Sequence, residues 1–146
     1  AKRIGVKLVD LETLLIESDF VSIHTPLTKD TYKMIGKREL EMIKPKAFLI
    51  NTSRGGIVDE AAVYEVLVKG KLAGAAFDVY DKEPPDPDNP LLALNNVIAT
   101  PHMASHTEEA LERMAVTVAK DVVKVLKAEH PKYLANPAIF KKVPNA

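Results

Sequence analysis

Four short runs of apolar and β-branched residues recur along the chain, and each has the length of a β-strand. They cover residues 20–24 (FVSIH), 47–51 (AFLIN), 72–79 (LAGAAFDV) and 96–100 (NVIAT). The first run stops at Thr25-Pro26 because proline cannot extend a central strand. The run at 47–51 is almost continuously apolar, which is typical of a strand covered on both faces. The pattern therefore predicts four strands.

Apolar residues at helical spacing lie between and after these runs. The predicted helices cover residues 11–18, 36–45, 60–69 and 105–130. Asp10 and Asp59 can cap the first and third helices, and Gly70 can end the third. The sequence SHTE, from Ser105, matches a capping box for the long fourth helix. Strands and helices thus alternate along the chain.

This alternation predicts an α/β fold, a Rossmann-like parallel sheet with helices on both faces. Ligands of such sheets bind outside the carboxyl ends of the strands. The residues that follow the four predicted strands are Thr25-Pro26, 52–56, 78–83 and 101–105. We therefore expect the chemistry at these four segments, which supply hydroxyl, guanidinium, carboxylate and imidazole groups.

Composition narrows the class of protein further. The 146 residues are 47% hydrophobic and 27% charged, which is typical of a globular domain. Twenty basic residues balance twenty acidic ones, so nothing favours a nucleic-acid partner, and no apolar stretch is long enough to indicate a membrane span. The absence of Cys excludes disulfides and thiolate metal sites, and it fits a cytoplasmic location.

Arg54 lies in the turn NTSRGG, where two glycines permit a close approach of backbone to ligand. Its guanidinium can bind a carboxylate in a bidentate manner. An arginine in a turn is equally an ordinary solvent-exposed side chain, so residue type alone leaves both interpretations open.

His102 and Glu83 follow neighbouring predicted strands. A carboxylate beside an imidazole favours the imidazolium, which can donate and accept one proton near neutral pH. Reduction of a ketone needs such a proton donor, together with a group that holds the substrate carboxylate, here Arg54. The other histidines, His24, His106 and His130, are interpreted as structural.

Two other chemistries fit less well. A serine hydrolase would use Ser53 or Ser105, but neither lies in a G-x-S-x-G elbow. No H-x-x-x-H or H-E-x-x-H pair is present, so no metal site is predicted. Asp78 and Asp81 flank a turn in which a carboxylate cluster could bind a cation, although a ligand-binding and a solvated carboxylate are the favoured interpretation.

The segments HTPLT, NTSRGGIVDE, GAAFDVYDKEPP and NVIATPH together resemble the D-isomer-specific 2-hydroxyacid dehydrogenases, in order and in spacing. The phosphoglycerate dehydrogenase branch is the most similar in appearance. The resemblance implies that Arg54 binds the substrate carboxylate and keto oxygen, that His102 is the proton donor and acceptor, and that Glu83 orients His102. It also implies a set of cofactor-binding residues for NAD, with Asp78 at the nicotinamide carboxamide. This set is Thr25, Thr52, Ser53, Arg54, Asp78, His102, Met103, Ala104 and Ser105. Family members often have a Gly shortly after the His, whereas this chain reads HMASHT.

The glycine-rich fingerprint G-x-G-x-x-G is absent from this sequence. We therefore expect the first βαβ unit and most of a substrate domain to lie upstream. On this interpretation residues 1–130 are the C-terminal portion of an NAD-binding domain, and residues 131–146 are a tail that returns to the substrate domain. We expect the 146-residue chain alone to be inactive because it lacks a pyrophosphate site.

The function implied for the whole protein is oxidation of a small D-2-hydroxy acid with NAD, 3-phosphoglycerate to 3-phosphohydroxypyruvate being the first candidate. The alternatives are a hydroxypyruvate or glyoxylate reductase and a non-catalytic dinucleotide-binding scaffold. NADP in place of NAD stays open, because the acidic residue that would select it is not in this chain. The expected partners are a small 2-hydroxy or 2-keto acid and, by resemblance, further copies of the chain in a homo-oligomer.

Overall fold

A computed structural model describes residues 2–138 of the chain. The chain forms two compact units, Ala1–Ala104 and Ser105–Ala146. The predicted domain boundary at residue 130 stays a prediction, and residues 139–146 of the predicted tail lie outside the described residues.

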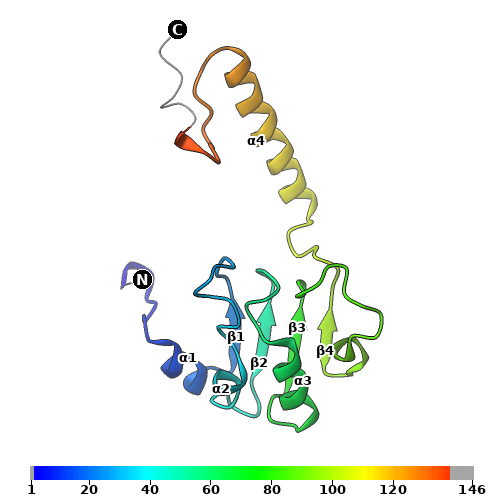
Figure 1. Ribbon diagram of the computed structural model, residues 1–146. Helices are drawn as coiled ribbons and strands as arrows, with labels where there is room; N and C mark the ends of the chain where they lie inside the picture. The colour runs from blue at the N-terminus through cyan, green and yellow to red at the C-terminus, as the bar shows by residue number, and fades with distance from the viewer. Residues whose placement is uncertain (1, 139–146) are drawn as a thin grey trace. The chain divides into compact units, whose positions relative to one another are not determined.

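The first unit contains one four-stranded parallel sheet (Figure 1). Its strands are β1 (Phe20–Ile23), β2 (Phe48–Asn51), β3 (Gly74–Phe77) and β4 (Val97–Ala99), and they lie in that order across the sheet. Every neighbouring pair is parallel, so the four carboxyl ends lie along one edge. The predicted Rossmann-like α/β class and the four strands are confirmed.

Helix α1 (Leu11–Glu17) precedes the first strand, whereas α2 (Lys37–Leu40) and α3 (Glu60–Val68) lie in the connections between strands, and local capping chemistry sets their ends. Asp10 accepts a hydrogen bond from the backbone N–H of Thr13, and Asp59 accepts one from Ala62, as their positions predict. Helix α2 is shorter than expected because a tight turn, in which Met42 N–H bonds to the Glu39 carbonyl, replaces the helical pattern after Leu40. Two 3-10 turns, η1 (Lys2–Ile4) and η2 (Pro90–Ala93), complete the unit.

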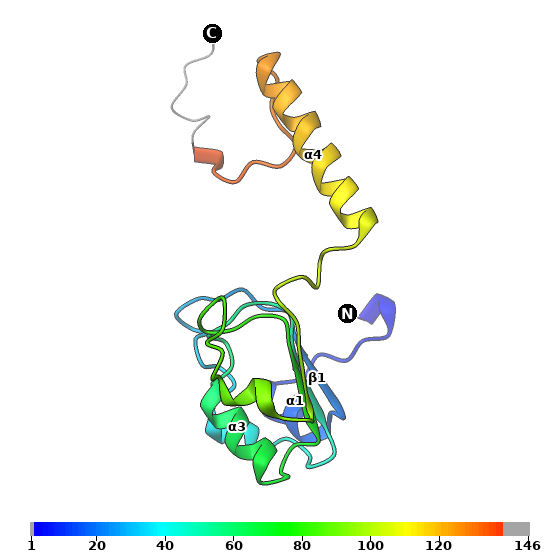
Figure 2. The ribbon, with the colours of Figure 1, turned by 90° about the vertical axis from the view of Figure 1, so that its right-hand side faces the viewer.

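The hydrophobic core of this unit lies on one face of the sheet. Leu15 of α1, Leu40 of α2 and Val63 of α3 are buried together with the strand residues Leu49 and Phe77. Figure 2 shows the sheet almost edge-on, with α3 beside one face. Side chains that alternate with the core residues point the other way, as the two-residue period of a strand requires.

That opposite face carries exposed apolar side chains. Phe20 and Phe48 lie opposite each other in the register of β1 and β2, and their rings stack at 5.4 Å between centroids. Phe20 and Ile98 are about 70% exposed, and Phe48 is also exposed. Within the first unit, the described residues therefore cover only one face of the sheet, and the helices predicted for the other face stay a prediction.

The second unit contains the long helix α4 (Glu108–Leu126). The predicted cap at Ser105 is wrong, because the Ser105 carbonyl accepts a bond from Thr107 N–H in a tight turn and the helix starts later. Thr107 is the cap, and its side chain accepts a bond from Ala110 N–H. The helix also ends earlier than predicted, at Leu126, since Ala128 adopts a left-handed φ of 58°.

Candidate active site

His102 and Glu83 form a pair at the carboxyl edge of the sheet. His102 Nδ1 and Glu83 Oε2 are 2.7 Å apart, and both side chains are partly exposed. The hydrogen bond with His102 holds the pKa of the Glu83 carboxyl below its ordinary value, although burial opposes this. The structure thus brings together the two residues that were predicted as an acid–base pair.

Asp78 holds the His102 turn through hydrogen bonds; it follows β3 and is 3% exposed. Asp78 Oδ1 accepts hydrogen bonds from Thr100 Oγ1 at 2.6 Å and from Met103 N–H at 2.8 Å. Asp78 Oδ2 accepts a bond from Ala104 N–H at 2.8 Å. These bonds allow His102 to adopt an uncommon left-handed φ of 53°, with its own N–H bonded to the Asp78 carbonyl.

The charge of Asp78 follows from this environment. Burial disfavours the carboxylate, but the bonds from Thr100, Ala104 and Met103 outweigh burial, so the pKa of Asp78 lies below its ordinary value. Asp78 is therefore an ionised anchor of the turn that carries His102.

Asn51, at the end of β2, organises the turn that carries Arg54. It is 1% exposed, and its Nδ2 donates to the Arg54 carbonyl at 2.9 Å. Its Oδ1 accepts bonds from the backbone N–H and the hydroxyl of Ser53. Asn51 was not among the residues predicted for the site. The available signal was a polar residue that closes an apolar strand just before a glycine-flanked turn.

One cleft of about 390 Å³ contains the three predicted catalytic residues. It is lined by Leu27, Tyr32, Arg54, Gly55, Gly56, Tyr80, Asp81, Glu83 and His102. Arg54 is exposed, and its Nη1 donates to the Ser53 carbonyl at 2.6 Å. A cation, a carboxylate and an imidazole thus share one opening.

The predicted cofactor residues occupy varied positions. Thr25 follows β1, and its Oγ1 is buried without a hydrogen-bond partner among residues 2–138. Thr52 is exposed, whereas the Ser53 hydroxyl already donates to Asn51. Met103 is exposed beside His102.

The remaining members of that predicted set lie in or next to the His102 turn. Ala104 is bonded to Asp78 and ends the first unit, whereas Ser105 begins the second unit. The contacts of the whole set with NAD stay predictions.

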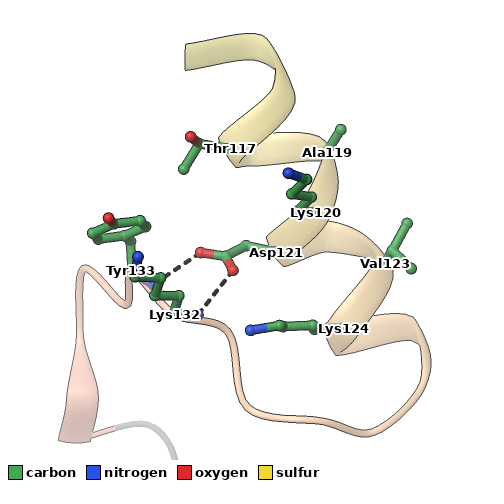
Figure 3. Close-up of a pocket in the computed structure, with 8 residues that line it drawn as sticks. All are labelled: Thr117, Ala119, Lys120, Asp121, Val123, Lys124, Lys132 and Tyr133. Carbon is green, nitrogen blue, oxygen red and sulfur yellow. Dashed lines mark hydrogen bonds between the residues drawn. The ribbon is translucent and has the colours of Figure 1, made fainter. Parts of the chain in front are cut away.

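A second cleft, of about 500 Å³, lies in the other unit beside α4. Figure 3 shows the Asp121 carboxylate accepting bonds from the backbone N–H groups of Lys132 and Tyr133, both at 2.8 Å. These bonds lower the pKa of Asp121 and hold residues 132–133 against the helix. None of the predicted site residues lines this cleft, and its bonds serve to fasten the segment after α4.

Residues 2–138 contain no group of three or more His, Asp or Glu that could hold a metal ion. Within the same residues, no helix combines the length and apolar character needed to cross a bilayer.

Residues 1–104 match the family model described as D-isomer specific 2-hydroxyacid dehydrogenase, NAD binding domain. The chain belongs to this family. The resemblance inferred from the four motifs is confirmed, and the matched residues coincide with the first compact unit. NAD is therefore the cofactor of the family to which this 2-hydroxyacid dehydrogenase domain belongs.

Two relatives illustrate the range of names within the family. The chain is 53% identical over 127 residues to D-3-phosphoglycerate dehydrogenase of Archaeoglobus fulgidus, and the alignment covers 87% of this chain and 24% of the relative. It is 49% identical over 140 residues to glyoxylate reductase of Korarchaeum cryptofilum, and this alignment covers 96% of this chain and 42% of the relative. The chain thus spans less than half the length of either relative.

Solved structures agree with this family assignment. The D-lactate dehydrogenase with NAD+ from Lactobacillus jensenii superposes with a TM-score of 0.81 at 35% identity, covering 88% of this chain and 42% of that one. The TT0316 protein from Thermus thermophilus superposes with a TM-score of 0.83 at 41% identity, covering 88% of this chain and 41% of that one.

Proposed function

We propose that the natural protein is an NAD-dependent oxidoreductase that interconverts a small D-2-hydroxy acid and the corresponding 2-keto acid. The observation that carries the proposal is the 2.7 Å pair of His102 and Glu83, in the same cleft as Arg54. Ketone reduction needs a proton donor and a cationic group for the substrate carboxylate, and this cleft contains both.

An unpartnered hydroxyl at the sheet edge supports binding of a dinucleotide cofactor there. The buried Thr25 Oγ1 lacks a partner among the described residues, and a buried hydroxyl without a partner is costly unless a ligand satisfies it. Thr25 and the exposed Thr52 would hold NAD on this proposal. When bound, the nicotinamide supplies or accepts the hydride at C2 of the substrate.

Arg54 has the role of substrate anchor. Its planar guanidinium can donate two parallel hydrogen bonds to the substrate carboxylate. The hydrogen bonds of Asn51 with Arg54 and Ser53 fix the backbone of the turn that carries the guanidinium. A fixed guanidinium orients the carbonyl of the bound substrate toward His102.

His102 transfers the proton. During reduction the substrate carbonyl oxygen gains negative charge, and the His102 imidazolium donates its Nε2 proton to that oxygen. Nδ1 remains bonded to Glu83, which fixes the orientation of the imidazole ring. In the oxidative direction the same Nε2 nitrogen accepts the hydroxyl proton.

For the substrate, we propose 3-phosphoglycerate, with 3-phosphohydroxypyruvate as its oxidised partner. The relative from Archaeoglobus fulgidus, at 53% identity, supports this choice. Glyoxylate or hydroxypyruvate is the second candidate, supported by glyoxylate reductases at 49% and 48% identity. The test uses the natural protein at its full length and a panel of these 2-keto acids. Oxidation of NADH, followed by its loss of absorbance, gives kcat/KM for each acid and so ranks the candidates.

The decisive variant is His102→Ala. We expect kcat to fall by about 100-fold or more, because the proton donor is lost, while NADH binding measured by fluorescence is retained. His106→Ala is the matched control, since His106 lies outside the cleft. Turnover of His102→Ala equal to that of the wild type would contradict the proposed chemistry and favour a dinucleotide-binding scaffold.

A further inference from the structure

The turn that carries Arg54 and the loop that carries Glu83 touch each other through their backbones. A Cβ atom at Gly55 would lie 1.8 Å from the Tyr80 carbonyl oxygen and 2.8 Å from Asp81 N. No side chain fits in that space, so glycine is required for the two segments to approach this closely.

Asp81 connects the two segments by its side chain, and its backbone connects the loop to α3. Its Oδ1 accepts a hydrogen bond from Gly56 N–H at 2.6 Å, within the Arg54 turn. Its own N–H donates to Glu60 Oε1 at 2.6 Å. Both bonds have a carboxylate acceptor, which makes them stronger than bonds between neutral groups.

Glu60, the first residue of α3, braces this connection from the helix. Its second oxygen accepts a bond from Asn89 Nδ2 at 2.9 Å. Glu60 therefore binds the loop at two points, at Asp81 and at Asn89, with three prolines at positions 84, 85 and 87 between them. The carbonyl of Gly56 is held separately by Lys33 N–H at 2.7 Å.

Glu83 depends on the same loop. Its Oε1 accepts a bond from Tyr80 N–H at 3.1 Å, while its Oε2 contacts His102. A shift of the 80–81 segment would move Glu83 and release the Arg54 turn together. We infer that Asp81, braced by Glu60, is a positioning residue that holds the substrate-anchoring turn in register with the acid–base pair.

This inference rests on the proposed function, and two substitutions at Asp81 separate its position from its charge. Asp81→Asn keeps an oxygen that can accept from Gly56 N–H, whereas Asp81→Ala removes it. We expect Asp81→Ala to raise the KM for the 2-keto acid about tenfold with a smaller change in kcat and an unchanged KM for NADH. Asp81→Asn should restore the KM to within about twofold of the wild type.

Two further variants complete the set, all assayed in the natural protein at its full length. Asp88→Ala is the control, an exposed carboxylate of the same loop that lies outside the cleft, and it should leave the KM unchanged. If Asp81→Ala does not fold, Glu60→Ala removes only the brace and should raise the KM about threefold. An equal rise for Asp81→Asn and Asp81→Ala, or an unchanged KM in Asp81→Ala and Glu60→Ala, would overturn the inference.

A measurement independent of turnover separates this inference from the proposed function. Hydrogen exchange of the Gly56 amide should be slow in the wild type and in Asp81→Asn, and at least about tenfold faster in Asp81→Ala. If the wild type reduces no 2-keto acid, the proposed function fails, while the exchange rates still report whether Asp81 holds the turn. Equal exchange in all three proteins would show that it does not.

Discussion

Replacement of Asp78 by Asn tests whether one buried carboxylate holds the His102 turn. The substitution preserves the size of the side chain. Its amide oxygen can still accept the bonds from Thr100 Oγ1 and Met103 N–H, now made at 2.6 and 2.8 Å. Its amide nitrogen, however, must face Ala104 N–H, which now bonds to Asp78 Oδ2 at 2.8 Å. Two hydrogen-bond donors, the amide nitrogen of the new Asn side chain and Ala104 N–H, then face each other at a buried position.

The expected cost follows from these three bonds. Losing one bond to a charged acceptor costs roughly 1.5–3 kcal/mol, and the two remaining bonds weaken because their acceptor is neutral. Removing the charge also removes the penalty of burying it, which offsets part of this loss. We expect Asp78→Asn to lower the free energy of unfolding by about 2 kcal/mol at pH 7.

The pH dependence has a definite sign. Because the pKa of Asp78 is lowered in the folded protein, its stabilising contribution is complete above the ordinary value of 3.8. The contribution is lost as the pH falls below 3.8, through the folded value. The difference between wild type and Asp78→Asn should therefore be constant from pH 7 to about pH 4 and shrink in more acidic solution.

Equilibrium urea unfolding, followed by circular dichroism at several pH values, measures this difference. Asp86→Asn is the matched control, because the Asp86 side chain forms only an exposed ion pair with Lys82 among the described residues, and its loss should cost less than about 0.5 kcal/mol. A cost for Asp78→Asn as small as that of the control at pH 7, or a cost that does not change below pH 3.8, would refute the reasoning.

Three further substitutions, the first paired with a control at Gly70, test the rest of the site. Gly55→Ala should lower the free energy of unfolding by more than about 3 kcal/mol, because the new methyl group meets the Tyr80 carbonyl. Gly70 has open space around it but a φ of 65°, so Gly70→Ala, the control, should cost about 1 kcal/mol. Thermal unfolding measures both costs. Equal costs would contradict the described contact. Arg54→Lys should raise the KM for the 2-keto acid about tenfold while the KM for NADH stays constant, since lysine cannot bind a carboxylate in a bidentate manner; a KM within about twofold would argue against its role. Glu83→Gln should lower kcat about 100-fold at pH 7, where the lowered pKa keeps the wild-type carboxyl ionised, and steady-state rates equal to those of the wild type would exclude the acid–base pair.

Local patterns were sufficient to predict the four strands of the first unit and the starts of α1 and α3. The strands, the caps Asp10 and Asp59, and the left-handed Gly70 all depend on residues within one or two turns of each other. The start of α4 was predicted wrongly because Ser105 and Thr107 are both good capping residues, and only the backbone conformation decides between them.

The candidate site divides in the same way. Arg54, Glu83 and His102 could be proposed from their residue types and from their positions after predicted strands, because parallel strands end at one edge of a sheet. Asn51, Glu60 and the anchoring role of Asp78 could not, because their significance depends on which groups they bond.

Hydrogen-bond partners explain this division. Thr100 and Asp78 are 22 positions apart in the chain, and Gly56 and Asp81 are 25 apart. Periodicity and capping depend on near neighbours, so the order of residues was enough to predict the class of fold, the family resemblance and the chemical groups available. A hydrogen bond depends on a few tenths of an ångström and on direction, so only the packed sheet edge decided which of those groups act on one another.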